Sequence, residues 1–256
     1  MDKKMFCFQC EQTVGCTGCT GNAGVCGKKA DTAKLQDELT GALISLAKAA
    51  DSTETISKRT GQIIIEGLFT TVTNVSFDNA AIENMIQKVR AEKERLVPDC
   101  RTEEYDLQQL WNANEDIRSL KSLILFGIRG MAAYAYHANV LNYEDAEVNQ
   151  FFCEALSKIG YEESTEALLS TVLKTGEINL KCMALLDKAN TETYGTPEPT
   201  DVTLTVEKGP FIVVTGHDLK DLQLLLEQTE GKGINIYTHG EMLPAHAYPF
   251  LKKYSH

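Results

Sequence analysis

Cys7-Phe8-Gln9-Cys10 opens the segment around which the whole sequence is organised, and three more cysteines follow it, Cys16, Cys19 and Cys26. Glycines alternate with these later thiols, at Gly15, Gly18, Gly21, Gly24 and Gly27. Five thiols in twenty residues, with few bulky apolar residues between them, do not form a packed core. Because thiolates bind soft metals and iron-sulfur clusters, the segment predicts an inorganic centre.

Three kinds of site compete for these thiols. Disulfides are disfavoured, because a cysteine cluster in a reducing compartment more often binds a metal or acts in catalysis. A zinc site could use Cys7, Cys10, Cys16 and Cys19, but the two Cys-x2-Cys pairs would be only five residues apart, where zinc motifs usually have about a dozen or more. An iron-sulfur cluster on four of the five thiols is favoured. The spacing alone does not say which four bind.

The residues after the cysteine segment have the apolar spacing of helices. Leu35, Leu39, Leu43 and Leu46 lie on one face of a helix that we expect to begin at the N-cap Asp31. Similar patterns predict a first set of three helices, at about 31–50, 53–75 and 78–95. Their short connections indicate an up-down-up bundle.

A second set of three helices follows a polar connector over residues 98–113. The apolar spacing places these helices at about 114–141, 144–159 and 164–190, with a possible break at Gly176. Three helices followed by three helices is the pattern of a duplicated bundle.

The pattern changes after Pro197 and Pro199. Residues 202–206 alternate like an edge strand, and the apolar run 211–214 is typical of a buried parallel strand. A helix and a strand at 234–237 complete one βαβ unit. Since so small a parallel sheet cannot cover both its faces, we expect the chain to stop inside an α/β domain. The predicted divisions are a cluster loop at 1–30, a helical domain at 31–197 and the beginning of an α/β domain at 198–256.

A second group of ligand-type side chains lies in this last division. His217 follows the first predicted strand and Glu241 follows the second, so both fall beyond the carboxyl ends of parallel strands, where ligands bind in α/β folds. The simpler interpretation is that these residues only begin helices, as a cap or a first-turn carboxylate. His239-Gly240-Glu241 also resembles half of the zinc deaminase motif, but no Pro-Cys-x-x-Cys follows, so we reject that function.

The remaining candidates have structural interpretations. Cys153 and Cys182 fall within predicted helices and are expected to be buried apolar residues, and we expect the same of His137 and Trp111.

The net charge of the chain disfavours some classes of binding partner. It has 25 Lys plus Arg against 36 Asp plus Glu, a net charge of -11, which disfavours nucleic acid and anionic membranes. No apolar run approaches the roughly 20 residues of a membrane span, and no signal peptide is visible. The expected location is cytoplasmic.

Read together, these residues resemble the hybrid cluster protein family, also called prismane or hydroxylamine reductase. The resemblance rests on long strings spread over the chain: Met5-Phe6-Cys7-Phe8-Gln9-Cys10-Glu11-Gln12-Thr13, Val25-Cys26-Gly27-Lys28, Leu35-Gln36-Asp37, Asn114-Glu115-Asp116-Ile117-Arg118-Ser119-Leu120, Ala184-Leu185-Leu186-Asp187, Thr193-Tyr194-Gly195, Gly216-His217-Asp218-Leu219-Lys220-Asp221 and Tyr237-Thr238-His239-Gly240-Glu241-Met242-Leu243-Pro244-Ala245.

The resemblance implies a mainly α fold followed by α/β: two three-helix bundles and then the start of a Rossmann-like domain. It implies a 4Fe-4S cluster on Cys7, Cys10, Cys19 and Cys26, which leaves Cys16 as a spare thiol. It also implies that His217 and Glu241 are ligands of a second centre, a hybrid 4Fe-2O-2S cluster.

The implied function is that of an oxidoreductase that reduces hydroxylamine to ammonia, or reduces nitric oxide. Its electron donor would be a ferredoxin-like protein or a flavin or iron-sulfur reductase. Family members continue for about as long again, so we expect this chain to be a piece of a longer protein and inactive alone. The alternatives are a protein like carbon monoxide dehydrogenase and a zinc-stabilised helical interaction module.

Overall fold

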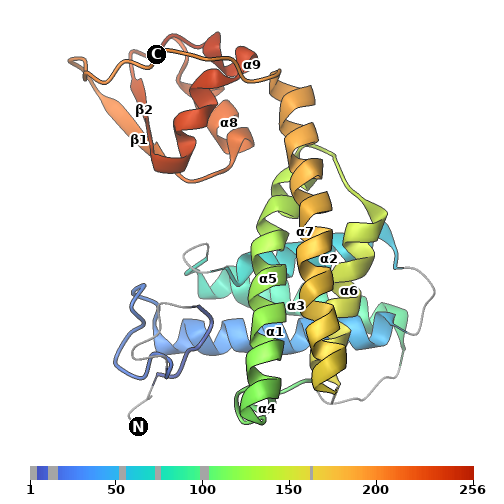
Figure 1. The fold of residues 1–256 in the computed structure, drawn as a ribbon. Helices are drawn as coiled ribbons and strands as arrows, with labels where there is room; N and C mark the ends of the chain where they lie inside the picture. Colours follow the sequence, from blue (N-terminus) through green and yellow to red (C-terminus); the bar gives the residue numbers. More distant parts are fainter. Residues whose placement is uncertain (1–4, 11–16, 52–55, 73–75, 99–103, 162–163) are drawn as a thin grey trace. The chain divides into compact units, whose positions relative to one another are not determined.

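The computed structural model describes residues 5–10, 17–51, 56–72, 76–98, 104–161 and 164–256 (Figure 1). Its contacts divide the chain into two compact units. The helical unit comprises Met1–Tyr136 and Glu144–Met183, and the α/β unit comprises His137–Tyr143 and Ala184–His256.

The first three predicted helices are present, with changed ends. They are α1 (Ala30–Ala50), α2 (Lys58–Thr70) and α3 (Asn79–Leu96). The prediction of Asp31 as N-cap is wrong: α1 is capped by Lys29 without a side-chain hydrogen bond, and Asp31 lies in the first turn. Helix α2 starts later than predicted, because the Ser57 side chain accepts a hydrogen bond from the Thr60 N–H and so caps the helix there.

The second set of helices is also present. These helices are α5 (Glu115–Val140), α6 (Ala146–Gly160) and α7 (Thr165–Tyr194). Helix α7 passes through Gly176 without a break. The segment expected to be a polar connector contains a short helix, α4 (Leu107–Trp111), which Asp106 caps by accepting from the Gln108 N–H.

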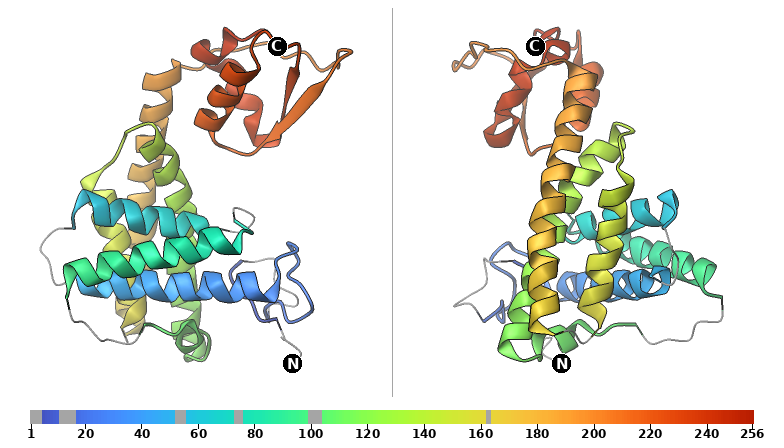
Figure 2. Two further views of the ribbon diagram at one scale, coloured as in Figure 1. Left: turned by 180° about the vertical axis from the view of Figure 1, so that it is seen from behind. Right: turned by 45° about the vertical axis from the view of Figure 1, so that its right-hand side comes forward.

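One apolar core joins the helices of the helical unit. Figures 1 and 2 show α1, α2 and α3 side by side, with α5, α6 and α7 running across them. Leu43 of α1, Ile64 of α2 and Phe152 of α6 are fully buried in the same cluster as Ile124 of α5. Because side chains from both sets fill this core, each set is stabilised by the other, and two separate bundles remain a prediction.

The α/β unit contains the predicted βαβ motif. Strand β1 (Phe211–Thr215) leads through α8 (Leu219–Thr229) to β2 (Asn235–His239), followed by the 3-10 helix η2 (Gly240–Ala247) and α9 (Pro249–Lys252). The strands pair in parallel, with Phe211 opposite Asn235 and Thr215 opposite His239.

Two predictions about these strands are wrong. No strand forms over the described residues 202–206, where Leu204 is 93% exposed. The run 211–214 is a parallel strand, but it is not buried: Phe211 is 61% and Val213 57% exposed. Phe211 and Val213 lie on the same face of β1, and their exposure shows that this face is not covered in the part of the chain that the structure describes.

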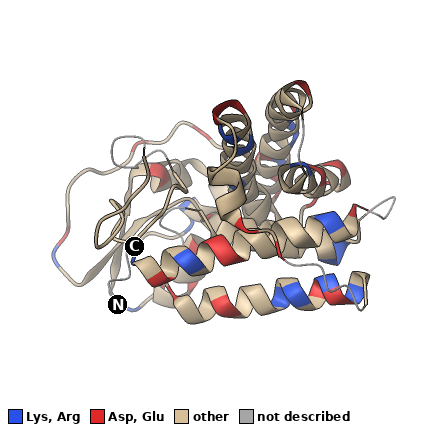
Figure 3. Cartoon of the chain, turned by 90° about the horizontal axis from the view of Figure 1, so that it is seen from below, with Lys and Arg blue, Asp and Glu red and all other residues tan. Residues whose placement is uncertain are grey.

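Charged residues of both signs occur on the same helices (Figure 3). Several of them pair between elements, such as Lys88 of α3 with Glu66 of α2. Within the described ranges, no helix combines the length and the apolar character needed to cross a membrane.

Candidate metal sites

Two of the predicted cysteine ligands lie side by side. The Cys7 N–H donates to the Cys19 carbonyl at 3.1 Å, and the Cys19 N–H donates to the Cys7 carbonyl at 2.7 Å. Gly18 makes this close approach possible, because its φ of +94° is in the region that favours glycine, and a Cβ there would stand 3.1 Å from the Cys7 carbonyl oxygen. Both cysteines are buried.

The third thiol lies on a tight turn. The Gly24 N–H donates to the Lys28 carbonyl at 2.8 Å, and the Gly27 N–H donates to the Gly24 carbonyl at 2.9 Å. A Cβ on Gly24 would stand 3.4 Å from the Cys26 sulfur. A side chain at this position would therefore touch the thiol.

Cys7, Cys10, Cys19 and Cys26 form no disulfide among the described residues. Burial raises the pKa of Cys7, so in the absence of a metal this thiol stays protonated. Within the described residues, no three His, Cys, Asp or Glu side chains lie close enough together to hold a metal ion. The structure thus joins Cys7 to Cys19 but does not bring the sulfurs to one point, and Cys16 lies outside the described residues.

The donor set nevertheless fits an iron-sulfur cluster in its chemistry. Thiols are the ligands that such clusters take, and the glycines of the loop let its backbone turn closely around a bound group.

Aromatic side chains anchor this loop on the helical core. The rings of Phe6 and Trp111 have centroids 5.0 Å apart, and those of Phe8 and Trp111 are 4.7 Å apart. Trp111 was expected to be buried; it packs against the core but is only partly buried. These contacts cover the start of the loop with apolar surface, which excludes water from one side of Cys7.

A polar network under the loop was not predicted. The Lys28 Nζ donates to Gln9 Oε1 at 2.8 Å, and Gln9 Nε2 donates to Asp37 Oδ1 at 2.6 Å. Lys28 is 2% exposed. A lysine two residues after a cysteine was the available signal, but its burial depends on α1, which the loop sequence does not reveal.

The isolated cysteines are core residues, as predicted. Cys153 and Cys182 are fully buried, and each thiol points to a backbone carbonyl at 3.5 Å, of Ala47 and Met131 respectively. Burial raises the pKa of both to about 12, which keeps them unreactive.

In the α/β unit, His217 and Glu241 follow the carboxyl ends of β1 and β2, as predicted. Both are exposed, and Glu241 lies in the first turn of η2. His217 does not cap α8: the neighbouring Asp218 accepts from the Lys220 and Asp221 N–H groups. Asp218 also lies 3.2 Å from Nδ1 of the half-buried His137. His217 is therefore left without the structural role of a cap.

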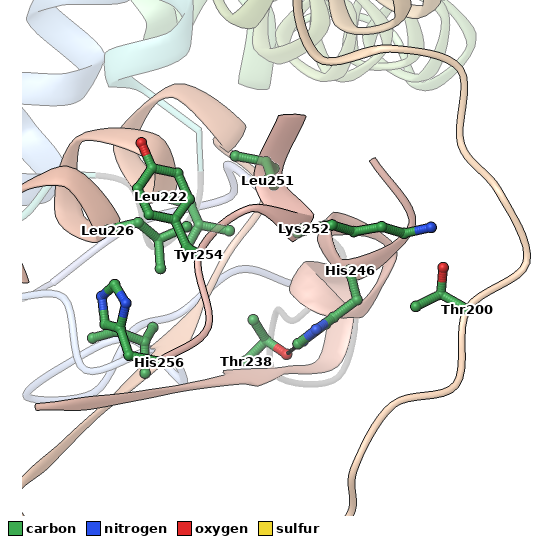
Figure 4. Close-up of a pocket in the computed structure, with 11 residues that line it drawn as sticks. Thr200, Leu222, Leu226, Thr238, His246, Leu251, Lys252, Tyr254 and His256 are labelled. Atoms are coloured by element: carbon green, nitrogen blue, oxygen red, sulfur yellow. Dashed lines mark hydrogen bonds between the residues drawn. The ribbon is translucent and has the colours of Figure 1, made fainter. Parts of the chain in front are cut away.

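A cavity of about 240 Å³ lies beside β2 in the same unit (Figure 4). Leu222, Leu226 and Leu251 line it, together with His246, whose Nε2 is 2.8 Å from the Thr238 hydroxyl. His217 and Glu241 are not among the residues that line it. The cavity is thus separate from the predicted ligands.

Comparisons with known proteins cover almost the whole chain. The sequence model of the Prismane/CO dehydrogenase family matches residues 5–256. The chain is 47% identical to a hydroxylamine reductase of Thermodesulfovibrio yellowstonii, over 98% of this chain and 52% of that protein. It is 44% identical to a hydroxylamine reductase of Porphyromonas gingivalis, over 100% of this chain and 52% of that protein. The chain therefore spans about half the length of the curated relatives it matches.

Proposed function

The chain belongs to the Prismane/CO dehydrogenase family, and from this we propose that it is part of an iron-sulfur oxidoreductase whose cysteine loop carries electrons. The main support is that the family match includes the cysteine loop, and that the similar relatives are named hydroxylamine reductases.

In this proposal Cys7, Cys10, Cys19 and Cys26 hold a 4Fe-4S cluster, which supplies one-electron transfer when bound. The chain's own residues shape its surroundings. Phe8 and Trp111 keep water from one side of the loop. The Gly18 and Gly27 backbone, both with positive φ, lets the loop turn closely around its ligands.

His217 and Glu241 would contribute to a second centre, the hybrid 4Fe-2O-2S cluster. Imidazole and carboxylate together suit an iron site that keeps a position open for substrate. Their exposed places at the ends of paired strands support this role, since ligands of α/β folds bind at that edge. Further ligands would come from the part of the relatives that lies beyond this match.

The reaction that we propose for the whole protein is reduction of hydroxylamine, which breaks the N–O bond and yields ammonia and water, or else reduction of nitric oxide. Electrons would come from a ferredoxin-like protein or a flavin or iron-sulfur reductase. Carbon monoxide oxidation is the second candidate, because the family description includes CO dehydrogenase. The relatives' names favour the first.

Metal analysis of the anaerobically prepared chain tests the first centre. We expect about four irons per chain with matching acid-labile sulfide. Cys153→Ala is the matched control and should keep the same iron content, because its thiol is in the helical core. One zinc per chain without iron would refute the cluster and favour a zinc-stabilised module.

A further inference from the structure

Two cationic side chains are buried in the helical unit at the cysteine loop. Lys28 is 2% and Arg129 5% exposed. The Arg129 Nε donates to the Thr71 hydroxyl at 3.0 Å, and its Nη2 donates to the Thr40 hydroxyl at 2.9 Å. Neutral hydroxyls therefore satisfy part of the guanidinium, but they contribute no negative charge to balance it.

The third nitrogen of Arg129 has no such partner. Nη1 is buried, and no hydrogen-bond acceptor for it exists among the described residues. A buried donor without an acceptor calls for an explanation, because leaving such a group unpaired is unfavourable.

The nearby negative charge does not match the two cations. Asp37 is the carboxylate of the network, linked to Lys28 through Gln9. Burial raises the pKa of Asp37 to about 6, although the Gln9 hydrogen bond and the charges of Arg129 and Lys28 oppose the rise, and the exposed Asp106 adds to it. Among the described residues of this network, two buried cations are thus accompanied by one carboxylate, whose negative charge burial disfavours.

Cys7 interacts electrostatically with both cations, and Cys10 interacts with Arg129. Full burial lowers the pKa of Arg129 to about 10, and negative charge on Asp37, Cys7 and Cys10 counteracts this. The charge of Lys28 lowers the pKa of Cys7, against the rise that burial causes. The hydrogen bonds agree with this: Lys28 reaches Gln9, which lies between Cys7 and Cys10 in the sequence, and Arg129 reaches Thr40, three positions after Asp37 on α1.

We propose that Lys28 and Arg129 are counter-charges for the cluster on Cys7, Cys10, Cys19 and Cys26, and that they set its reduction potential. This inference rests on the proposed function. A cluster with four thiolates is an anion, and reduction adds one more negative charge. Buried cations stabilise the reduced form more than the oxidised form, so they raise the potential. The two residues are positioning residues, since neither is a ligand.

The test is a redox titration of the reconstituted chain. Absorption and electron paramagnetic resonance spectra monitor the state of the cluster during the titration. Lys28→Met and Arg129→Met remove one charge each at similar length. Each should shift the potential to more negative values by about a tenfold change in the ratio of reduced to oxidised cluster, which is about 59 mV for one electron. The charge-retaining Lys28→Arg and Arg129→Lys should stay near the parent value.

Lys121→Met is the matched control. Lys121 is a buried lysine on the same helix as Arg129, eight positions away, which is about 12 Å along the axis. Its Nζ donates to the Tyr161 carbonyl at 2.7 Å, an acceptor outside the cysteine loop. Its loss should leave the potential unchanged.

The outcomes separate this inference from the proposed function. If the parent chain binds no iron, the proposed function fails. If clusters form but both Met variants keep the parent potential, the counter-charge proposal is wrong. If the Met variants lose iron while the charge-retaining variants keep it, the proposal stands, because charge and not shape is then required. Equal loss of iron in all four variants would contradict it.

Discussion

Cys10 and Cys16 are the two thiols that best distinguish the proposed ligand set. Cys10 belongs to the Cys7-x2-Cys10 pair, whereas Cys16 has no assigned role. We expect Cys10→Ser to abolish cluster assembly and Cys16→Ser to leave it intact, because serine does not replace a thiolate ligand. Iron and sulfide content per chain is the measurement. Similar losses in both variants would show that the ligands are wrongly chosen.

Glu92 joins two helices through its carboxylate. It is fully buried, accepts a 2.7 Å hydrogen bond from the Thr60 hydroxyl of α2, and pairs with Arg95 on its own helix α3 at 2.7 Å. Hydrogen bonds from Arg95 and Thr60 lower the pKa of Glu92 from 4.5 to about 2, although burial opposes the change.

The pH dependence of stability follows from this shift. Because the folded pKa lies below the unfolded one, the contribution of Glu92 is complete above about pH 4.5 and is lost as the pH falls toward 2. Glu92→Gln should lower the free energy of unfolding by only about 1–2 kcal/mol at pH 7, since its partner Arg95 is partly exposed to solvent. Chemical denaturation of the cluster-free chain measures this, and the difference between variant and parent should shrink toward pH 2. A constant difference would exclude the linkage.

At the scale of elements, Gly41 of α1 permits a close crossing. A Cβ at Gly41 would overlap the Tyr105 carbonyl oxygen, and the Tyr105 N–H donates to Ser45 of α1 at 3.0 Å. Gly41→Ala should therefore destabilise the chain by about 1–3 kcal/mol, the usual cost of overpacking.

Gly176→Ala is the control for this substitution. Gly176 also lies within a helix, α7, but a Cβ there would meet no atom within 4 Å. Alanine should stabilise this helix by up to about 1 kcal/mol. Denaturant unfolding of both variants checks the contrast, and a similar loss at Gly41 and Gly176 would show that crowding against Tyr105 is unimportant.

The elements that the sequence predicted well are those with local signals. Apolar spacing located α3 and α5–α7 closely, and the parallel strands were expected from the runs at 211–214 and 234–237. The short α4 was missed, because five residues carry too little periodicity. The prediction that β1 is buried was wrong, because an apolar run indicates a preference for a sheet and does not show whether another element covers that sheet.

The candidate sites show the same limit. The cysteines and His217 with Glu241 are predictions from residue type and position. Arg129, Lys28 and Asp37 were not, because they come from separate parts of the chain and meet only through tertiary packing. Their charge near the thiols is a property of the fold, and no local spacing carries it.

At the scale of the molecule, the chain spans about half the length of its curated relatives. It carries only His217 and Glu241 of the proposed second centre, and two exposed side chains hold a metal weakly. We therefore expect no hydroxylamine reduction by the 256-residue chain alone. Ammonia formation with a reduced dye as donor is the assay, with the Thermodesulfovibrio yellowstonii relative as positive control. Turnover by the chain would contradict this expectation.

The two backbone hydrogen bonds between Cys7 and Cys19 have a consequence for handling the protein in air. Residues that exchange both bonds across an antiparallel pair have Cα atoms about 5.5 Å apart, which is a span that a disulfide fits. When the proposed cluster is not bound, molecular oxygen can take one hydrogen from each thiol, which links the two sulfurs and forms hydrogen peroxide. A chain purified aerobically should then lack two countable thiols, and a dithiol reagent must be added before iron can return.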